Sequence, residues 1–115
     1  MSRRNAELKA AARERKIPMG VYVVRNLATG LVRLGRSVNV PAALNRHRFT
    51  LQLGSHLDKA LQAEWRRDGA EAFIFEVLDL LPEKDEPTAE PAEELEALLS
   101  LWTAQLGDRV VGHFA

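Results

Sequence analysis

Two short runs of strand-favouring residues, separated by a tight turn, constrain the fold of this chain more than any other part of its sequence. The first run, residues 20–26, reads GVYVVRN and is rich in β-branched residues and tyrosine. The second run, residues 31–36, alternates between its two faces. Between the runs lies a turn that ends in Thr29-Gly30, where glycine is free to adopt a positive φ. The sequence therefore predicts an antiparallel β-hairpin over residues 20–36.

Helices and one further strand are predicted around this hairpin. Asn39 is a good N-cap, Pro41 suits the first turn of a helix, and Gly54 would end it. Residues 73–81 are almost entirely apolar, so we expect this strand at the centre of the sheet. The predicted elements are a basic helix over 3–16, strands over 20–26 and 31–36, helices over 40–53 and 56–67 with Ser55 as cap of the latter, a strand over 73–81, and a helix over 92–107.

The chain has 115 residues, which fits one domain. We divide it into a basic helical extension, residues 1–18, and a domain, residues 19–115, that contains an acidic, proline-broken linker over 82–91. The absence of cysteine excludes disulfides and thiolate metal sites and is compatible with a cytoplasmic location, which we expect. The apolar runs are far too short for a membrane span, so no membrane partner is expected.

The formal net charge of zero conceals a strong asymmetry between the two halves of the chain. Residues 1–59 contain twelve Lys or Arg and three Asp or Glu, a net charge of +9. Residues 60–115 contain four and thirteen, a net charge of −9. The basic half indicates a polyanionic partner such as DNA, and self-complementary surface charge is the alternative. The acidic half suggests a protein partner or a segment that covers the basic face.

Several local motifs, taken in order, resemble the signature of the GIY-YIG nuclease family. The resemblance covers residues 19–107 and implies an α+β fold, in which helices flank a three-stranded antiparallel sheet and the basic N-terminal helix is an addition. The motifs that carry it are Gly20-Val21-Tyr22, Arg33-Leu34-Gly35, the segment GRSVNV at 35–40, NRHR at 45–48, LGSH at 53–56, Asp68-Gly69, and the strand that begins at Phe73.

The resemblance implies metal-assisted phosphodiester hydrolysis, in which positive charge stabilises the transition state and a carboxylate holds a divalent cation. Tyr22 corresponds to the family's first tyrosine and would position or deprotonate water, although a core-filling role is the alternative. His47 corresponds to the histidine of the first helix, and His56 to a second histidine. Surface polarity for His47 and a simple helix start for His56 are the alternatives.

Three positions depart from the family pattern. Arg33 stands at the second tyrosine, Ala43 at the catalytic arginine, and Leu99 at the metal-binding glutamate. Arg36 or Arg33 could supply a guanidinium to the space that alanine leaves. Glu96, one helical turn before Leu99, would be the substitute ligand for Mg²⁺ or Mn²⁺. A solvated acidic helix start is the alternative for Glu96, and no metal is needed if hydrolysis has been lost.

These departures favour one function over another without excluding either. The favoured interpretation is sequence-nonspecific DNA binding by a degenerate nuclease-like domain with weak or lost hydrolytic activity. The alternative is an active, divalent-metal-dependent endonuclease of DNA repair or recombination, in which the arginine and the glutamate have been relocated. The residues expected to bind nucleic acid are Arg33, Arg36, Arg46, Arg48, Arg13 and Lys16.

Overall fold

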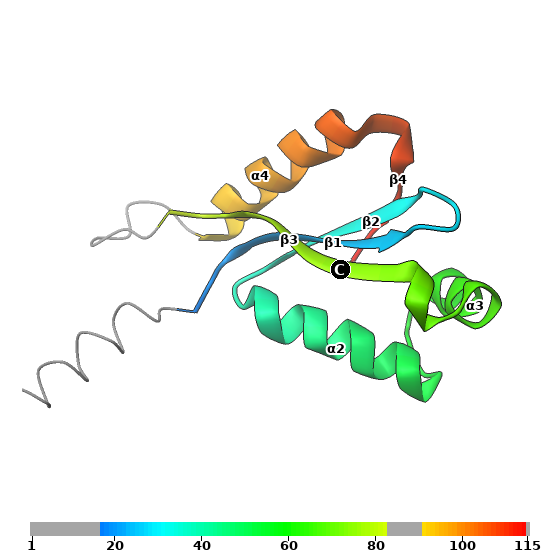
Figure 1. Cartoon of the computed structure of the whole chain (residues 1–115). Helices are drawn as coiled ribbons and strands as arrows, with labels where there is room; N and C mark the ends of the chain where they lie inside the picture. The colour runs from blue at the N-terminus through cyan, green and yellow to red at the C-terminus, as the bar shows by residue number, and fades with distance from the viewer. Residues whose placement is uncertain (1–16, 83–90, 115) are drawn as a thin grey trace, which may run out of the picture.

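The computed structural model describes residues 17–82 and 91–114. The predicted helix over 3–16, with Arg13 and Lys16, and most of the predicted acidic linker lie outside this range. In chain order, and labelled as in Figure 1, the elements are β1 (Gly20–Asn26), β2 (Val32–Ser37), α2 (Val40–Leu53), α3 (Lys59–Asp68), β3 (Phe73–Leu80), α4 (Pro91–Leu106) and β4 (Val110–His113), with 3-10 turns at Ala70–Ala72 and Gly107–Arg109. None of the described helices combines the length and the apolar character that crossing a membrane would require.

The four described strands form one mixed sheet in the order β3-β1-β2-β4. Strand β1 pairs antiparallel with β2 and with β3, as predicted for three strands, whereas β4 pairs parallel with β2. The prediction of a three-stranded, purely antiparallel sheet was therefore wrong, because the sheet has a fourth strand that pairs in parallel. A parallel neighbour needs a crossover connection, and α4 provides it. The expectation that residues 73–81 form a central strand was also wrong, because β3 lies at one edge and half its side chains are only partly covered.

Helices cover both faces of the sheet. Figure 1 shows α4 on one face and α2 on the other, with α3 near one end of the α2 face. Side chains alternate between these faces along each strand. Tyr22 packs with residues of α2, and Val24 with residues of α2 and α3, whereas Val23 packs with the apolar side of α4. The buried apolar side chains of the described residues are Val21, Tyr22, Val23, Val24, Val32, Leu34, Val40, Ala43, Leu51, Leu61, Phe73 and Leu95.

The helix α2 begins and ends as its capping residues predict. The Asn39 side chain accepts a hydrogen bond from the backbone N–H of Ala42 at 3.1 Å, and Gly54 ends the helix with φ at 77°. The start of α3 was predicted at residue 56 and lies three residues later, because the Asp58 carboxylate accepts from the Leu61 N–H at 3.0 Å. This later start leaves residues 55–58 as a loop against α2.

A β-bulge in β4 determines which face of the sheet His113 and Phe114 each occupy. Val32 pairs with Val110 and Arg33 with Gly112, so Val111 has no partner of its own. The extra residue shifts the alternation of the strand by one position. After the bulge, His113 reaches α4, where its Nε2 lies 2.8 Å from the Thr103 hydroxyl. Phe114 lies on the α2 face, and its N–H donates to the Leu34 carbonyl at 2.9 Å.

Candidate functional site

Tyr22, His47 and His56 form a continuous buried chain of hydrogen bonds. The Tyr22 hydroxyl lies 2.8 Å from His47 Nε2, and His47 Nδ1 lies 2.8 Å from His56 Nε2. The first side chain comes from β1, the second from α2, and the third from the loop before α3. The structure thus brings together the three residues that the sequence predicted as catalytic remnants. Their burial contradicts the alternative in which His47 is an exposed polar residue, since only 8 % of it is exposed.

The backbone N–H of Asp58 determines which group donates and which accepts in each of these hydrogen bonds. The Asp58 N–H donates to His56 Nδ1 at 2.9 Å, so the proton of the neutral His56 ring is on Nε2. That proton points to His47 Nδ1, which leaves the His47 proton on Nε2, directed at the Tyr22 oxygen. Tyr22 therefore accepts from His47 and does not donate to it. In this arrangement no ring nitrogen is free to remove a proton from Tyr22.

Burial keeps all three groups neutral near pH 7. Burial raises the pKa of Tyr22 to about 12, and the nearby Arg46 charge opposes this effect. Burial, followed by the charges of His56 and Arg46, lowers the pKa of His47 to about 4. The pKa of His56 is also lowered, mainly by burial. With a pKa of about 12, roughly one Tyr22 in 10⁵ is ionised at pH 7, so the site holds no ready base.

Small residues make room for the Tyr22 ring. Gly35 pairs with Tyr22 across the hairpin, and a Cβ at this position would overlap the phenol ring. Ala43 is buried against the same ring from α2. Ala43, which the motif resemblance aligned with a catalytic arginine, is thus part of the core, and its side chain has no charge to offer the site.

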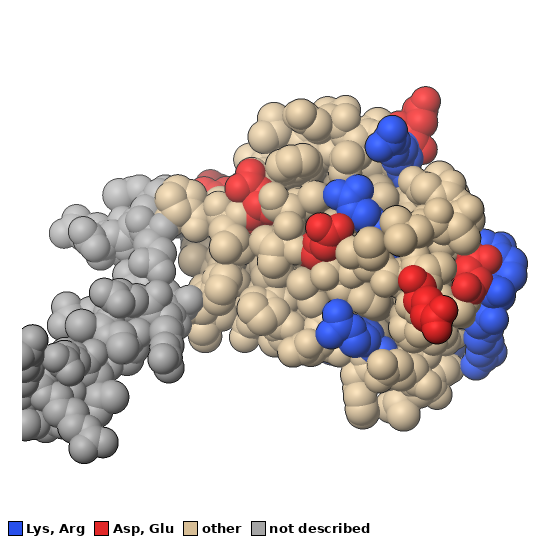
Figure 2. Space-filling view, viewed as in Figure 1, with Lys and Arg blue, Asp and Glu red and all other residues tan. Residues whose placement is uncertain are grey.

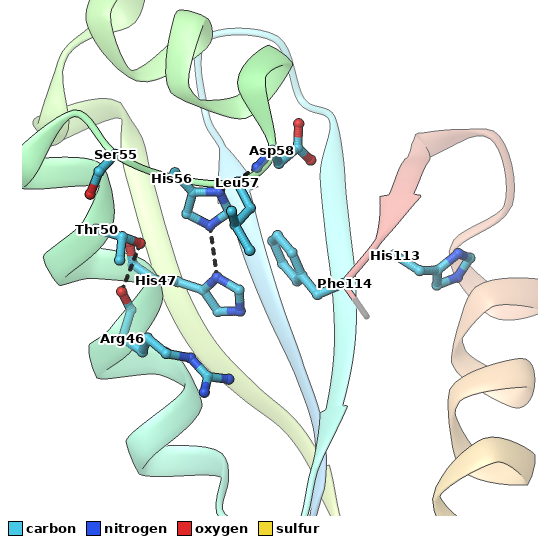
Figure 3. A pocket seen from close by; sticks show the side chains of 9 residues that line it. All are labelled: Arg46, His47, Thr50, Ser55, His56, Leu57, Asp58, His113 and Phe114. Atoms are coloured by element: carbon cyan, nitrogen blue, oxygen red, sulfur yellow. Dashed lines mark hydrogen bonds between the residues drawn. The ribbon is translucent and has the colours of Figure 1, made fainter.

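Phe114 packs on the hydrogen-bonded chain, and it is one of the residues that line two cavities. Its ring centroid lies 4.0 Å from that of His47 and 5.9 Å from that of Tyr22, to which it is stacked. A first cavity, of about 510 Å³, opens on the α2 side, and a second, of about 490 Å³, on the α4 side. Figure 3 shows the first cavity, with the Phe114 ring directed toward the two histidines. The first is lined by Arg46, His47, Thr50, Ser55, His56, Leu57, Asp58, His113 and Phe114, and the second by Arg36, Glu96, Leu99, Ser100, Thr103, Ala104, His113 and Phe114.

Neither Phe114 nor the two cavities was predicted from the sequence. Phe114 is separated by many residues from the motifs that resemble the nuclease family. The available signal was the strand-favouring pair Val110-Val111 after Gly107, followed by an aromatic residue. That signal predicts a strand, but it does not predict that a bulge directs Phe114 toward α2.

Arg33 does not occupy a position open to a polyanion, in contrast to the expectation from sequence. Its guanidinium donates to Asp58 at 3.0 Å and forms an ion pair with Glu64 at 2.7 Å, and its side chain is 8 % exposed. Hydrogen bonds from Arg33 and Asn26 outweigh burial and lower the pKa of Glu64. Arg33 therefore connects β2 to α3, and its charge is neutralised by two carboxylates.

The remaining candidate cations are distributed over several parts of the surface. Arg48 lies over the Phe75 ring, 4.8 Å from its centroid, and Arg36 forms an ion pair with Glu96 at 3.4 Å. Arg46 lines the first cavity, and none of the ion pairs among the described residues includes it. Figure 2 shows Lys and Arg separated by acidic and uncharged residues on the face in view. The charge asymmetry of the sequence therefore does not translate into a continuous basic patch over this face.

The residues near the expected metal position do not fit a divalent cation. Mg²⁺ and Mn²⁺ prefer carboxylate and other hard oxygen ligands, and Leu99 offers none. Glu96 is largely exposed and pairs with Arg36. Within residues 17–82 and 91–114 no group of three His, Asp or Glu side chains is arranged to hold a metal ion. Both ring nitrogens of His47 and of His56 are already used in hydrogen bonds.

Comparison with known proteins identifies the fold. No protein-family model matches the chain, and no curated protein matches it at a significant level. Among solved structures, the catalytic domain of the homing endonuclease I-TevI matches with a TM-score of 0.64 and 21 % identity, over 84 % of this chain and 98 % of that one. A point mutant of the catalytic domain of the intron endonuclease I-TevI matches with a TM-score of 0.65 and 19 % identity, over 85 % of this chain and 93 % of that one.

The chain thus has a GIY-YIG-like fold, as its motifs predicted. At these identities the likeness establishes the fold of the chain and not its activity. The residues that would bind or cleave a substrate must be judged from the local chemistry of the site.

Proposed function

We propose that this protein binds nucleic acid, with DNA as the natural candidate, through a nuclease-like domain whose hydrolytic activity is weak or lost. The observation that supports this most directly is the state of Arg46. This guanidinium lies beside the cavity next to Tyr22 and His47, and no described carboxylate neutralises it. A guanidinium that none of the described carboxylates neutralises, beside a cavity of about 510 Å³, suits a backbone phosphate.

Weak or lost hydrolysis follows from the groups that cleavage would need. Tyr22 is neutral at pH 7, because its pKa is about 12, and His47 cannot accept its proton. Ala43 and Leu99 stand where a guanidinium and a carboxylate would be expected. Loss of one electrostatic donor to a transition state costs about 3–4 kcal/mol, which corresponds to a rate reduction of 10²–10³. Binding of phosphate needs no such precise arrangement.

Gel retardation of DNA at low salt, without divalent cations, tests the binding. We expect retardation of the unmodified chain and weaker retardation of Arg46→Ala. Arg109→Ala is the matched control, because Arg109 is also exposed and lines neither cavity. Absence of retardation for any DNA, or equal effects of the two substitutions, would contradict the proposal.

The second candidate is an active, metal-dependent endonuclease, with a role in DNA repair or recombination. The observation that favours it is the position of Arg46, whose charge opposes the effect of burial and lowers the pKa of Tyr22. Arg46 would replace the missing arginine from the next turn of α2. Nicking of supercoiled plasmid with Mn²⁺ that is lost in Tyr22→Phe and in Glu96→Ala would support this candidate over the first. No cleavage above the level of a mock preparation would reject it.

A further inference from the structure

We propose that Phe114 is a stacking platform for unpaired bases, so that the preferred ligand is a single-stranded nucleic-acid segment that crosses Phe114. This inference rests on the proposed nucleic-acid binding and specifies its substrate class. The two cavities that Phe114 lines would each receive one nucleotide, and one arginine lies at each of them.

The position of Phe114 supports this assignment. The residue lines both cavities, and its backbone is held by the hydrogen bond from its N–H to Leu34. The residue is partly exposed, and its ring rests on His47, whose nitrogens are used by Tyr22 and His56. An aromatic ring held on a rigid support beside an open cavity is the kind of platform on which bases stack in single-strand binding proteins. Bases within a duplex are already stacked on both faces, so only unpaired bases can use such a ring.

The charges beside the ring suit a sugar-phosphate backbone. Arg46 lines the first cavity and Arg36 the second, so a strand that crosses Phe114 meets a cation on each side. Asp58 also lines the first cavity, but its carboxylate is engaged by Arg33 and by the Leu61 N–H. Glu96 competes for Arg36 through an exposed ion pair, which is worth little in water and can be displaced by phosphate.

The rim of the first cavity is equally suited to a base. Leu57 is 93 % exposed there, and an apolar side chain with this exposure gains from contact with a flat ring. The Thr50 hydroxyl donates to the carbonyls of Arg46 and His47, and it keeps its acceptor capacity for a ligand N–H. Figure 3 shows Leu57 and Phe114 on adjacent sides of this space.

The test is fluorescence anisotropy of the full chain, at low salt and without divalent cations, with three labelled probes of equal length. These are oligothymidylate, a blunt duplex, and an abasic single strand that has the same phosphates but no bases. We expect oligothymidylate to bind at least fivefold more tightly than the abasic strand and than the duplex, which corresponds to one stacked base. Phe114→Leu, which keeps an apolar side chain, should remove this difference, and Glu96→Gln should strengthen binding of both single strands.

A second variant protects the test against misfolding of Phe114→Leu. Leu57→Ser alters only an exposed side chain, and it should weaken oligothymidylate binding while leaving the abasic strand and the duplex unchanged. Equal binding of oligothymidylate and the abasic strand would overturn the stacking inference but leave phosphate binding intact. Tighter binding of the duplex than of oligothymidylate would likewise overturn the stacking inference but leave phosphate binding intact. Failure of all three probes to bind would instead reject the proposed function itself.

Discussion

Gly35 is the residue whose lack of a side chain most directly shapes the site. A Cβ at this position would overlap the Tyr22 ring and its hydroxyl, which is hydrogen-bonded to His47. We therefore predict that Gly35→Ala destabilises the protein by about 1–3 kcal/mol, the usual cost of overpacking. Gly112→Ala is the control, because a Cβ there would lie 3.7 Å from its nearest neighbour, an ordinary contact. Urea unfolding measures both, and equal effects would contradict the role assigned to Gly35.

His47 makes stability depend on pH in a defined direction. Its pKa is about 4 in the folded protein and near 6.5 when unfolded, so the unfolded chain binds the proton more readily between these values. The contribution of His47 to stability is therefore complete above about pH 6.5 and is lost progressively as the pH falls toward 4. The expected loss is on the order of 3 kcal/mol. Urea unfolding midpoints from pH 7.5 to 4.5 should fall, and His47→Gln should flatten the profile. A flat profile for the unmodified chain would contradict this assignment.

At the scale of secondary-structure elements, Arg33 joins β2 to the start and middle of α3. Loss of one partner from a buried ion pair leaves uncompensated charge, which costs about 3–5 kcal/mol. We predict a loss in this range for Arg33→Met, since Asp58 and Glu64 would both lose their cation. Arg25→Met is the matched control, because Arg25 and Glu76 form an exposed pair between β1 and β3 worth at most about 1 kcal/mol. Thermal and urea unfolding of both variants check the difference.

The bulge in β4 determines which face of the sheet receives Phe114. Deletion of Val111 should restore regular pairing and exchange the faces of His113 and Phe114. We expect the deletion variant to lose the nuclear Overhauser contacts between the Phe114 ring and His47, and to bind oligothymidylate no better than Phe114→Leu does. Retention of these contacts would mean that the bulge does not set the direction of Phe114.

For the molecule as a whole, with a formal net charge of zero, nucleic-acid binding should depend on few cations. Each phosphate contact contributes about 0.7 to the salt slope for a single strand. We predict that Arg46→Ala lowers the slope of log K against log salt by about this amount, and that Arg109→Ala leaves it unchanged. Anisotropy titrations of oligothymidylate at several salt concentrations measure the slope. An unchanged slope in Arg46→Ala would remove Arg46 from the binding surface.

Local signals in the sequence predicted much of this fold, and long-range contacts account for what they missed. The hairpin, the Asn39 cap and the end of α2 at Gly54 depend on neighbouring residues, and each was predicted. β4 has four residues and pairs on one side only, so no periodic signal identified it. Arg33 was expected to meet phosphate because its partners Asp58 and Glu64 are distant in sequence. The grouping of Tyr22, His47 and His56 in one site was predicted from the motif resemblance and not from the periodicity of apolar residues.

Asp58 uses three of its atoms for three different elements. Oδ1 caps α3, Oδ2 accepts from Arg33 in β2, and the backbone N–H sets the proton position on His56. The N-terminal cap of α3 and the orientation of the imidazole pair therefore depend on the same residue. If the first turn of α3 frays, the histidines lose the hydrogen bond that orients them. The proposed affinity for nucleic acid would then depend on a helix that does not itself contact the nucleic acid. On heating, affinity should begin to decline at the temperature where that turn opens, before the sheet itself melts.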